Sequence, residues 1–141
     1  MKIVDANVLL YGVNTGSAQH GPSRAWLERA LSGEEAIGFA WSVLLAFIRI
    51  STRASVFPRP LSSDQAVATA RDWLSQPPAV IVEPTGRHLA ELGRLLAASG
   101  AAGNLVSDAH LAALAIEHGA ELVTYDTDFA RFEGVRWAMP R

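Results

Sequence analysis

The sequence of 141 residues contains no cysteine. Disulfide bonds, thiolate metal sites and cysteine nucleophiles are therefore excluded. An excess of positive charge is also missing, because 12 Lys and Arg residues against 14 Asp and Glu residues leave a formal net charge of -2. A protein that holds nucleic acid through its overall positive charge is excluded as well, so a polynucleotide would have to meet a local group of arginines.

Long hydrophobic runs are absent too. The longest wholly apolar stretches, such as residues 43–48, fall far short of the roughly 20 residues that span a bilayer. Asp5 and Asn7 interrupt the apolar N-terminus before the core of a signal peptide could form. We therefore expect a soluble, cytoplasmic protein that does not associate with membranes.

The chain does contain ample material for a hydrophobic core, because 50% of its residues are hydrophobic. Its length favours one domain covering residues 1–141. We find no internal repeat and no linker long enough to separate two domains. Short segments rich in Gly, Pro, Ser and Asn divide this domain into elements.

Short apolar or β-branched runs alternate with segments of helical spacing. The runs predicted to form strands are residues 2–4, 36–40, 80–82, 121–125 and 135–139. The predicted helices are residues 22–32, 43–53, 63–75, 86–98 and 105–118, with N-caps at Ser-Ser-Asp for the third and Thr85 for the fourth, and Gly119 ending the last. This alternation implies βαβ crossovers and a mostly parallel sheet. We expect an α/β fold, namely a three-layer α/β/α domain with a central sheet of four to five strands.

Acidic residues fall where the ends of parallel strands should meet. Asp5 directly follows the first strand, Asp126 follows the strand at 121–125, and Asp128 lies in the same loop. Asp108 lies in the first turn of the helix at 105–118, on a face that it shares with apolar residues. Taken singly, each has an ordinary explanation, as a turn residue or as a complement to a helix N-terminus.

Together, four of the six Asp residues map to one edge of one sheet. Carboxylates in one pocket repel one another unless a divalent cation neutralises them, and hard oxygen ligands suit Mg²⁺ or Mn²⁺. Such an ion activates water and stabilises the charge that develops on a phosphoryl group. Phosphodiester hydrolysis is therefore the leading hypothesis for the chemistry.

Three ordered segments strengthen this hypothesis, namely VDANVLLY, GNLVSDAHLAALAIEHG and LVTYDTDFARF. They resemble PIN-domain proteins, and in particular the VapC toxins of type II toxin–antitoxin systems. The resemblance implies a Mg²⁺-dependent endoribonuclease, the toxin of a VapBC-type system, which forms a homodimer and is inhibited by a cognate VapB-like antitoxin. By the same resemblance Asp5, Asp108, Asp126 and Asp128 are the catalytic residues, and the first three of them are the metal ligands. Asp128 stands where many relatives also carry an acid.

Asn7 and Asn104 match polar positions that support the acidic site in the family. One departure from its pattern is Ala46, which stands where relatives usually carry a Glu on the helix after the second strand. Glu34 and Glu35 precede that strand and should lie at its opposite end. We expect one tightly held Mg²⁺, with Asp128 partly compensating. The alternative is a catalytically weak or inactive PIN-like module that binds RNA or an antitoxin without turnover.

The substrate surface is indicated by arginines, since 11 Arg residues stand against a single Lys. Arg49 and Arg53 share a helix face and are our candidates for RNA binding, the alternative being solvated surface charges. We expect the four Trp residues in the core or at an interface, and His110 at the surface. A receiver domain and a haloacid-dehalogenase-like phosphatase are disfavoured, because Lys2 is the only lysine and D-T-D comes near the end of the chain.

Overall fold

The computed structural model describes residues 1–100 and 103–141, except for the side chain of Asn104. In this part of the chain five strands form one sheet in the order β3-β2-β1-β4-β5, and every neighbouring pair is parallel. The strands are β1 (Lys2–Val4), β2 (Ile37–Ala40), β3 (Ala79–Val82), β4 (Glu121–Val123) and β5 (Arg136–Ala138). All five were predicted, although β4 ends two residues earlier than expected.

Helices connect these strands. They are α1 (Ala6–Val13), α2 (His20–Leu31), α3 (Trp41–Ser51), α4 (Ser63–Leu74), α5 (His88–Ser99) and α6 (Val106–Glu117), with short 3₁₀ helices η1 (Gly103–Leu105) and η2 (Thr127–Arg131). Helices α2 to α6 agree with the predicted segments to within two residues at each end, whereas α1 was not predicted.

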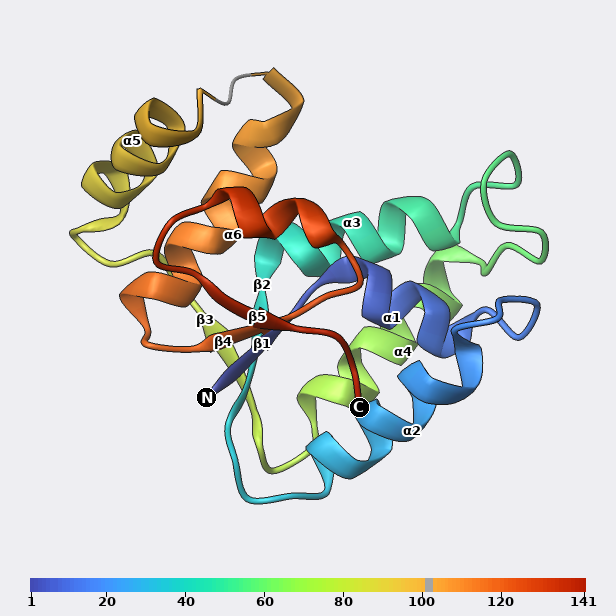
Figure 1. Ribbon diagram of the computed structural model, residues 1–141. Helices are drawn as coiled ribbons and strands as arrows, with labels where there is room; N and C mark the ends of the chain where they lie inside the picture. Colours follow the sequence, from blue (N-terminus) through green and yellow to red (C-terminus); the bar gives the residue numbers. More distant parts are fainter. Residues whose placement is uncertain (101–102) are drawn as a thin grey trace.

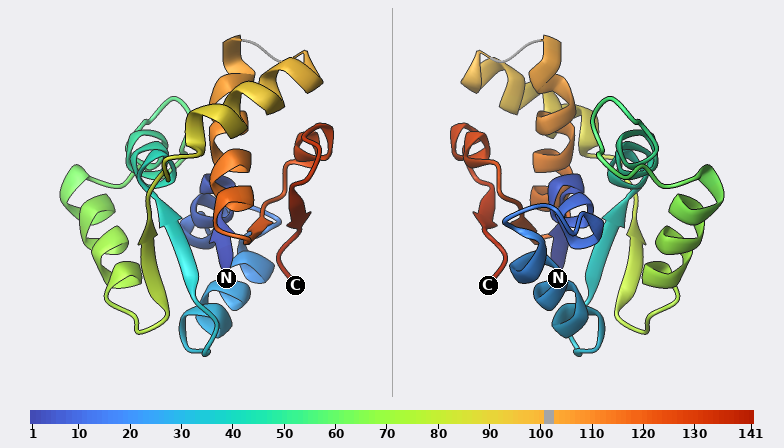
Figure 2. Two further views of the ribbon diagram at one scale, coloured as in Figure 1. Left: turned by 90° about the vertical axis from the view of Figure 1, so that its left-hand side faces the viewer. Right: turned by 90° about the vertical axis from the view of Figure 1, so that its right-hand side faces the viewer.

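The helices cover both faces of the sheet, which confirms the three-layer α/β/α prediction. Helices α5 and α6 lie on one side of the strands, and α1, α2 and α4 lie on the other (Figure 1; Figure 2). The core between the layers is built from the apolar residues of the strands and of the inner helix faces, among them Ile3, Val4, Phe39, Phe47 and Leu122. No helix among the described residues has the length and apolarity to cross a membrane.

The two predicted N-caps, of α4 and of α5, have different outcomes. Ser62 caps α4, because its hydroxyl accepts from the backbone N–H of Gln65 and the Gln65 side chain accepts from the Ser62 N–H in return. The N-cap prediction for Thr85 is wrong, because α5 starts after Arg87. Thr85 instead turns its hydroxyl and its backbone N–H toward Glu117 of α6.

The four Trp residues do not share one environment. Trp26 is buried in the core, whereas Trp73 and Trp137 are half-buried against it. Trp41, however, is 52% exposed at the first position of α3, so of the two environments expected, core or interface, it does not occupy the core. The backbone passes directly from the buried strand β2 into α3, and this places Trp41 at the carboxyl edge of the sheet.

Candidate active site

Asp5 lies immediately after β1 and begins α1. Its Oδ1 accepts a hydrogen bond from the backbone N–H of Ala6 at 2.7 Å. Its Oδ2 accepts from Asn7 Nδ2 at 3.2 Å and from Thr124 Oγ1 at 2.8 Å. The backbone N–H of Asp5 donates to the carbonyl oxygen of Val123 at the end of β4. The carboxylate is therefore held in one orientation between the ends of β1 and β4.

Thr124 makes this arrangement possible, and the sequence analysis missed it. The residue is fully buried directly after β4. Its hydroxyl donates to Asp5 and accepts from Asn7 Nδ2 at 3.0 Å and from the backbone N–H of Asp126 at 3.0 Å. One side chain thus ties Asp5, Asn7 and the Asp126 loop together. Its only signal in the sequence is its position two residues before Asp126.

Asp108 lies in the first turn of α6, where it was predicted. It lines a cleft of about 320 Å³ with Asp5, and Ser42, Ala46, Arg49 and Ser107 also line this cleft. Within the described part of the chain, no hydrogen bond or ion pair reaches the Asp108 carboxylate. Because Ala46 faces the same cleft, the wall that α3 contributes carries no carboxylate near the two aspartates.

The loop after β4 brings two further aspartates. Asp126 begins η2, and its Oδ1 accepts from the backbone N–H of Asp128 at 2.8 Å. Asp128 is exposed and forms an ion pair with Arg131 at 3.8 Å. Figure 1 shows η2 beyond the carboxyl ends of the strands, the edge of the sheet at which α3 also begins.

The four aspartates influence one another electrostatically. Burial, followed by the charges of Asp126, Asp5 and Asp128, raises the pKa of Asp108 to about 6, while Arg131 lowers it. The pKa of Asp5 is also raised, chiefly by burial and further by Asp126, against hydrogen bonds from Thr124 and Ala6 that lower it. The structure thus places Asp5, Asp126 and Asp128 close enough to Asp108 for their negative charges to oppose its ionisation.

The other predicted site residues lie at different places. Arg49 lines the acidic cleft, whereas Arg53 is exposed just beyond the end of α3 and does not line it. Asn104 belongs to η1, and its side chain lies outside the described part of the structure. Glu35 pairs with the N-terminal amine at 3.2 Å, which places it at the opposite edge of the sheet, as expected.

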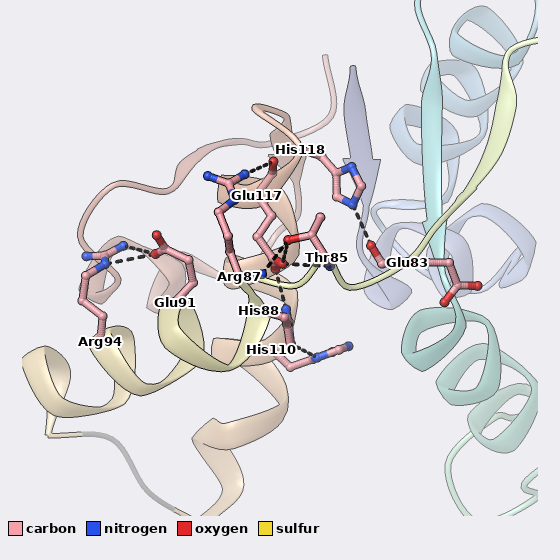
Figure 3. Close-up of polar contacts among 9 residues, drawn as sticks. All are labelled: Glu83, Thr85, Arg87, His88, Glu91, Arg94, His110, Glu117 and His118. Carbon is pink, nitrogen blue, oxygen red and sulfur yellow. Dashed lines mark hydrogen bonds and ion pairs between the residues drawn. The ribbon is translucent and has the colours of Figure 1, made fainter.

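His110 is partly exposed and does not line the acidic cleft, and it takes part in a network that the sequence did not predict. Its Nδ1 lies 2.8 Å from His88 Nε2, and His88 Nδ1 lies 2.5 Å from Glu117 Oε2 (Figure 3). Glu117 is buried and also accepts two hydrogen bonds from Thr85. This network connects α5 to α6 and lies apart from the acidic cleft.

The donor set of the acidic site suits a hard divalent cation, because it consists of carboxylate oxygens and their repulsion is what such an ion relieves. Among the residues that the structure describes, no three His, Asp or Glu side chains already form a group that could hold a metal ion. Binding would therefore require the carboxylates to turn toward the ion, and no hydrogen bond from the residues that the structure describes holds the Asp108 carboxylate against such a turn.

The class of protein follows from these observations: a parallel α/β domain with aspartates gathered at the carboxyl edge of its sheet. The sequence model of the PIN domain matches residues 2–135. The chain is 59% identical over 140 residues to Ribonuclease VapC37 of Mycobacterium tuberculosis, covering 99% of this chain and 97% of that protein. It is 42% identical to Ribonuclease VapC33 of the same species, covering 99% and 98% of the two chains. The chain therefore belongs to the PIN domain family.

Solved structures agree on the fold. The structure of VapBC2 from Rickettsia felis, bound to a DNA fragment from its promoter, matches with a TM-score of 0.72 at 20% identity and covers 98% of this chain and 97% of that one. The M. tuberculosis toxin VapC20, which cleaves the sarcin-ricin loop, matches with a TM-score of 0.69 at 21% identity, covering 96% and 99%. Because the relatives of this chain are named as ribonucleases, a nuclease site that needs a divalent metal is consistent with these comparisons.

Proposed function

We propose that this protein is an endoribonuclease, the toxin of a VapBC-type toxin–antitoxin system, and that it hydrolyses RNA phosphodiester bonds with Mg²⁺. The observation that carries the proposal is that Asp5 and Asp108 line one cleft, where burial first and then the charges of Asp126, Asp5 and Asp128 raise the pKa of Asp108 to about 6. The ribonuclease names of the similar VapC proteins support the choice of RNA as substrate. Mn²⁺ has the same ligand preferences and is the natural substitute.

In this proposal Asp5, Asp108 and Asp126 hold the metal, and Asp128 adds negative charge beside it. When bound, Mg²⁺ supplies charge neutralisation at the phosphate and activation of the attacking water. Asn7 and Thr124 orient Asp5 by donating to its Oδ2. We assign Asn104 a supporting role because of its place in the family motif.

Partners follow from the same reasoning. Arg49 and Arg53 bind RNA phosphates, Arg49 from the wall of the cleft itself. A VapB-like antitoxin covers the site, as the VapBC complexes among the structural relatives suggest. We further propose a homodimer of chains, each folded as one PIN-like domain over residues 1–141, that acts in the cytoplasm.

A second candidate is favoured by one observation. Ala46 lines the acidic cleft where the family pattern has a Glu, so the site offers one carboxylate fewer. A weaker metal site would give a PIN-like module that binds RNA or antitoxin without turnover.

The deciding experiment is an RNA cleavage assay with the purified chain, comparing Mg²⁺ with EDTA. We expect cleavage only with the metal, and a loss of more than about 100-fold in Asp5→Ala, because losing a ligand should exceed the effect of losing a supporting contact. Asp64→Asn, an exposed aspartate in the first turn of α4, should cleave like the parent. Equal cleavage without metal would refute the proposal, and RNA binding without cleavage would favour the inactive module.

A further inference from the structure

An exposed row of side chains runs along α3 beside the acidic cleft. Trp41, Leu45 and Arg49 are spaced four residues apart and so form one ridge on the helix surface. Trp41 is 52% exposed and Leu45 is 58% exposed, while Arg49 is also exposed. Single exposed apolar side chains are common on protein surfaces, but neighbouring ones beside a cleft are typical of a binding surface.

The ridge adjoins the place where the reacting phosphate must lie. Leu45 and Arg49 line the same cleft as Asp5 and Asp108. Trp41 lies one helical turn before Leu45, about 6 Å along the axis at 1.5 Å per residue. A phosphate held at the aspartates therefore has the nucleotides next to it within reach of this ridge.

The ridge also has the chemistry that a nucleotide requires. No hydrogen bond or ion pair engages the guanidinium of Arg49 anywhere in the described residues, so its charge is available for a phosphate. An exposed indole offers a flat face on which an unpaired base stacks, whatever the base is. The aspartates themselves repel RNA, and an attractive surface beside them is needed to hold the strand.

We propose that Trp41 stacks on an unpaired base next to the scissile phosphate, while Arg49 binds a neighbouring phosphate, so that the two side chains position the RNA strand across the aspartates. This inference rests on the proposed ribonuclease function and adds Trp41 as a positioning residue for the substrate. Position favours RNA over a second copy of the chain as the occupant. Leu45 and Arg49 line the cleft that also contains Asp5 and Asp108, so a strand whose phosphate lies at the aspartates passes over the ridge.

The test measures RNA binding in an Asp108→Asn background, which prevents cleavage, with a hairpin RNA that has an unpaired loop and with a duplex of the same sequence. We expect Trp41→Ala to weaken loop binding about tenfold, a typical effect of removing one stacked base. Trp41→Phe should restore most of the affinity, and neither change should alter the weaker duplex binding. Leu89→Ala is the matched control, since Leu89 is 80% exposed but does not line the cleft.

Steady-state cleavage with Asp108 intact gives a second readout. Trp41→Ala should raise KM for the loop substrate with little change in kcat, and stacking should quench a tryptophan signal that Trp41→Phe lacks. If Trp41→Ala leaves KM and loop affinity unchanged while the parent cleaves RNA, the inference fails and the proposed function stands. If Trp41→Ala instead changes only the oligomeric state in light scattering, the ridge is an interface between copies. A parent chain that neither binds nor cleaves RNA would refute both.

Discussion

At the scale of single residues, Asp108 is a carboxyl group whose ionised form is disfavoured in the folded protein. Its pKa is raised from its ordinary value of 3.8 to about 6, first by burial and then by the three neighbouring aspartates. Between these two pH values the unfolded chain loses the proton while the folded chain keeps it. Raising the pH through this window therefore destabilises the folded state, and above about pH 6 the penalty is complete.

Asp108→Asn should remove this penalty. In EDTA at pH 7.5 we expect the variant to be more stable than the parent by roughly 1 kcal/mol, a value reduced for solvent screening because Asp108 is only partly buried. The melting temperature should then rise by roughly 2–4 °C. At pH 4 the gain should vanish, because the parent is protonated as well.

The matched control is Asp64→Asn, which also replaces an aspartate in the first turn of a helix. It removes a favourable interaction with the helix N-terminus and should cost up to about 1 kcal/mol. Thermal unfolding of the three proteins at both pH values measures the difference. A gain for Asp108→Asn that is equal at pH 4 and pH 7.5 would contradict this account of the site.

The sequence predicted the aspartates and the supporting residue Asn7, but not Thr124, which also orients Asp5. Asp5 and Asp126 follow strands, and parallel strands end at one edge of a sheet, so their meeting could be predicted. Thr124 could not, because one buried hydroxyl after a strand leaves no periodic signal. That Trp41 lies outside the core was not predicted either, because its apolar surroundings along the chain suggested a core or interface position without separating the two.

At the scale of the elements, α1 shows where the sequence pattern fails. Gly12 stands in one of the short Gly- and Asn-rich segments that the sequence predicts as breaks, but it lies inside the last turn of α1. A Cβ at this position would come within 2.7 Å of Leu27 Cδ1, so a larger residue would have to displace the end of the Leu27 side chain. Glycine therefore suits the close approach of α1 to α2, and this tertiary reason is invisible along the chain. Strand β4 is shorter than predicted because its pairing with β1 ends at Val123, and the next residue, Thr124, donates its hydroxyl to Asp5.

Helices α5 and α6 are joined by a buried network that involves residues about 30 positions apart, so it too gives no local signal. Burial raises the pKa of Glu117, but hydrogen bonds from Thr85 and His88 outweigh this effect and lower it overall. A lowered pKa in the folded state means that the carboxylate contributes stability above its unfolded value of 4.5. That contribution is lost as the pH falls through the lower folded value.

Glu117→Gln should therefore destabilise the protein at pH 7 by about 1–3 kcal/mol, the range for hydrogen bonds to a buried charged group. The matched control is Glu91→Gln on α5, which removes the side-chain ion pair with Arg94 at 2.8 Å on the outside of the same helix pair (Figure 3). Surface pairs of this kind contribute less than about 1 kcal/mol. Urea unfolding at pH 7 separates the two variants, and losses of equal size would show that the network does not stabilise the α5–α6 pair.

At the scale of the whole molecule, the same repulsion links metal binding to folding. The net charge of -2 is small, so there is little overall charge repulsion within the chain for salt to screen. The negative charge is instead concentrated where β1, β4 and α6 bring the aspartates together. A divalent cation that binds this site in the folded state only should therefore stabilise the entire fold.

We expect the melting temperature of the parent to rise with Mg²⁺ concentration, corresponding to about 2.7 kcal/mol at 100 times the dissociation constant. Asp108→Asn should lose most of this rise, because a ligand is gone and part of the repulsion is already relieved. Asp64→Asn should keep it in full, and NaCl at matched ionic strength should not reproduce it. Differential scanning fluorimetry in the absence of RNA measures all four conditions independently of catalysis. A rise of equal size in Asp108→Asn and the parent would place the cation elsewhere, and with it the chemistry assigned to these aspartates.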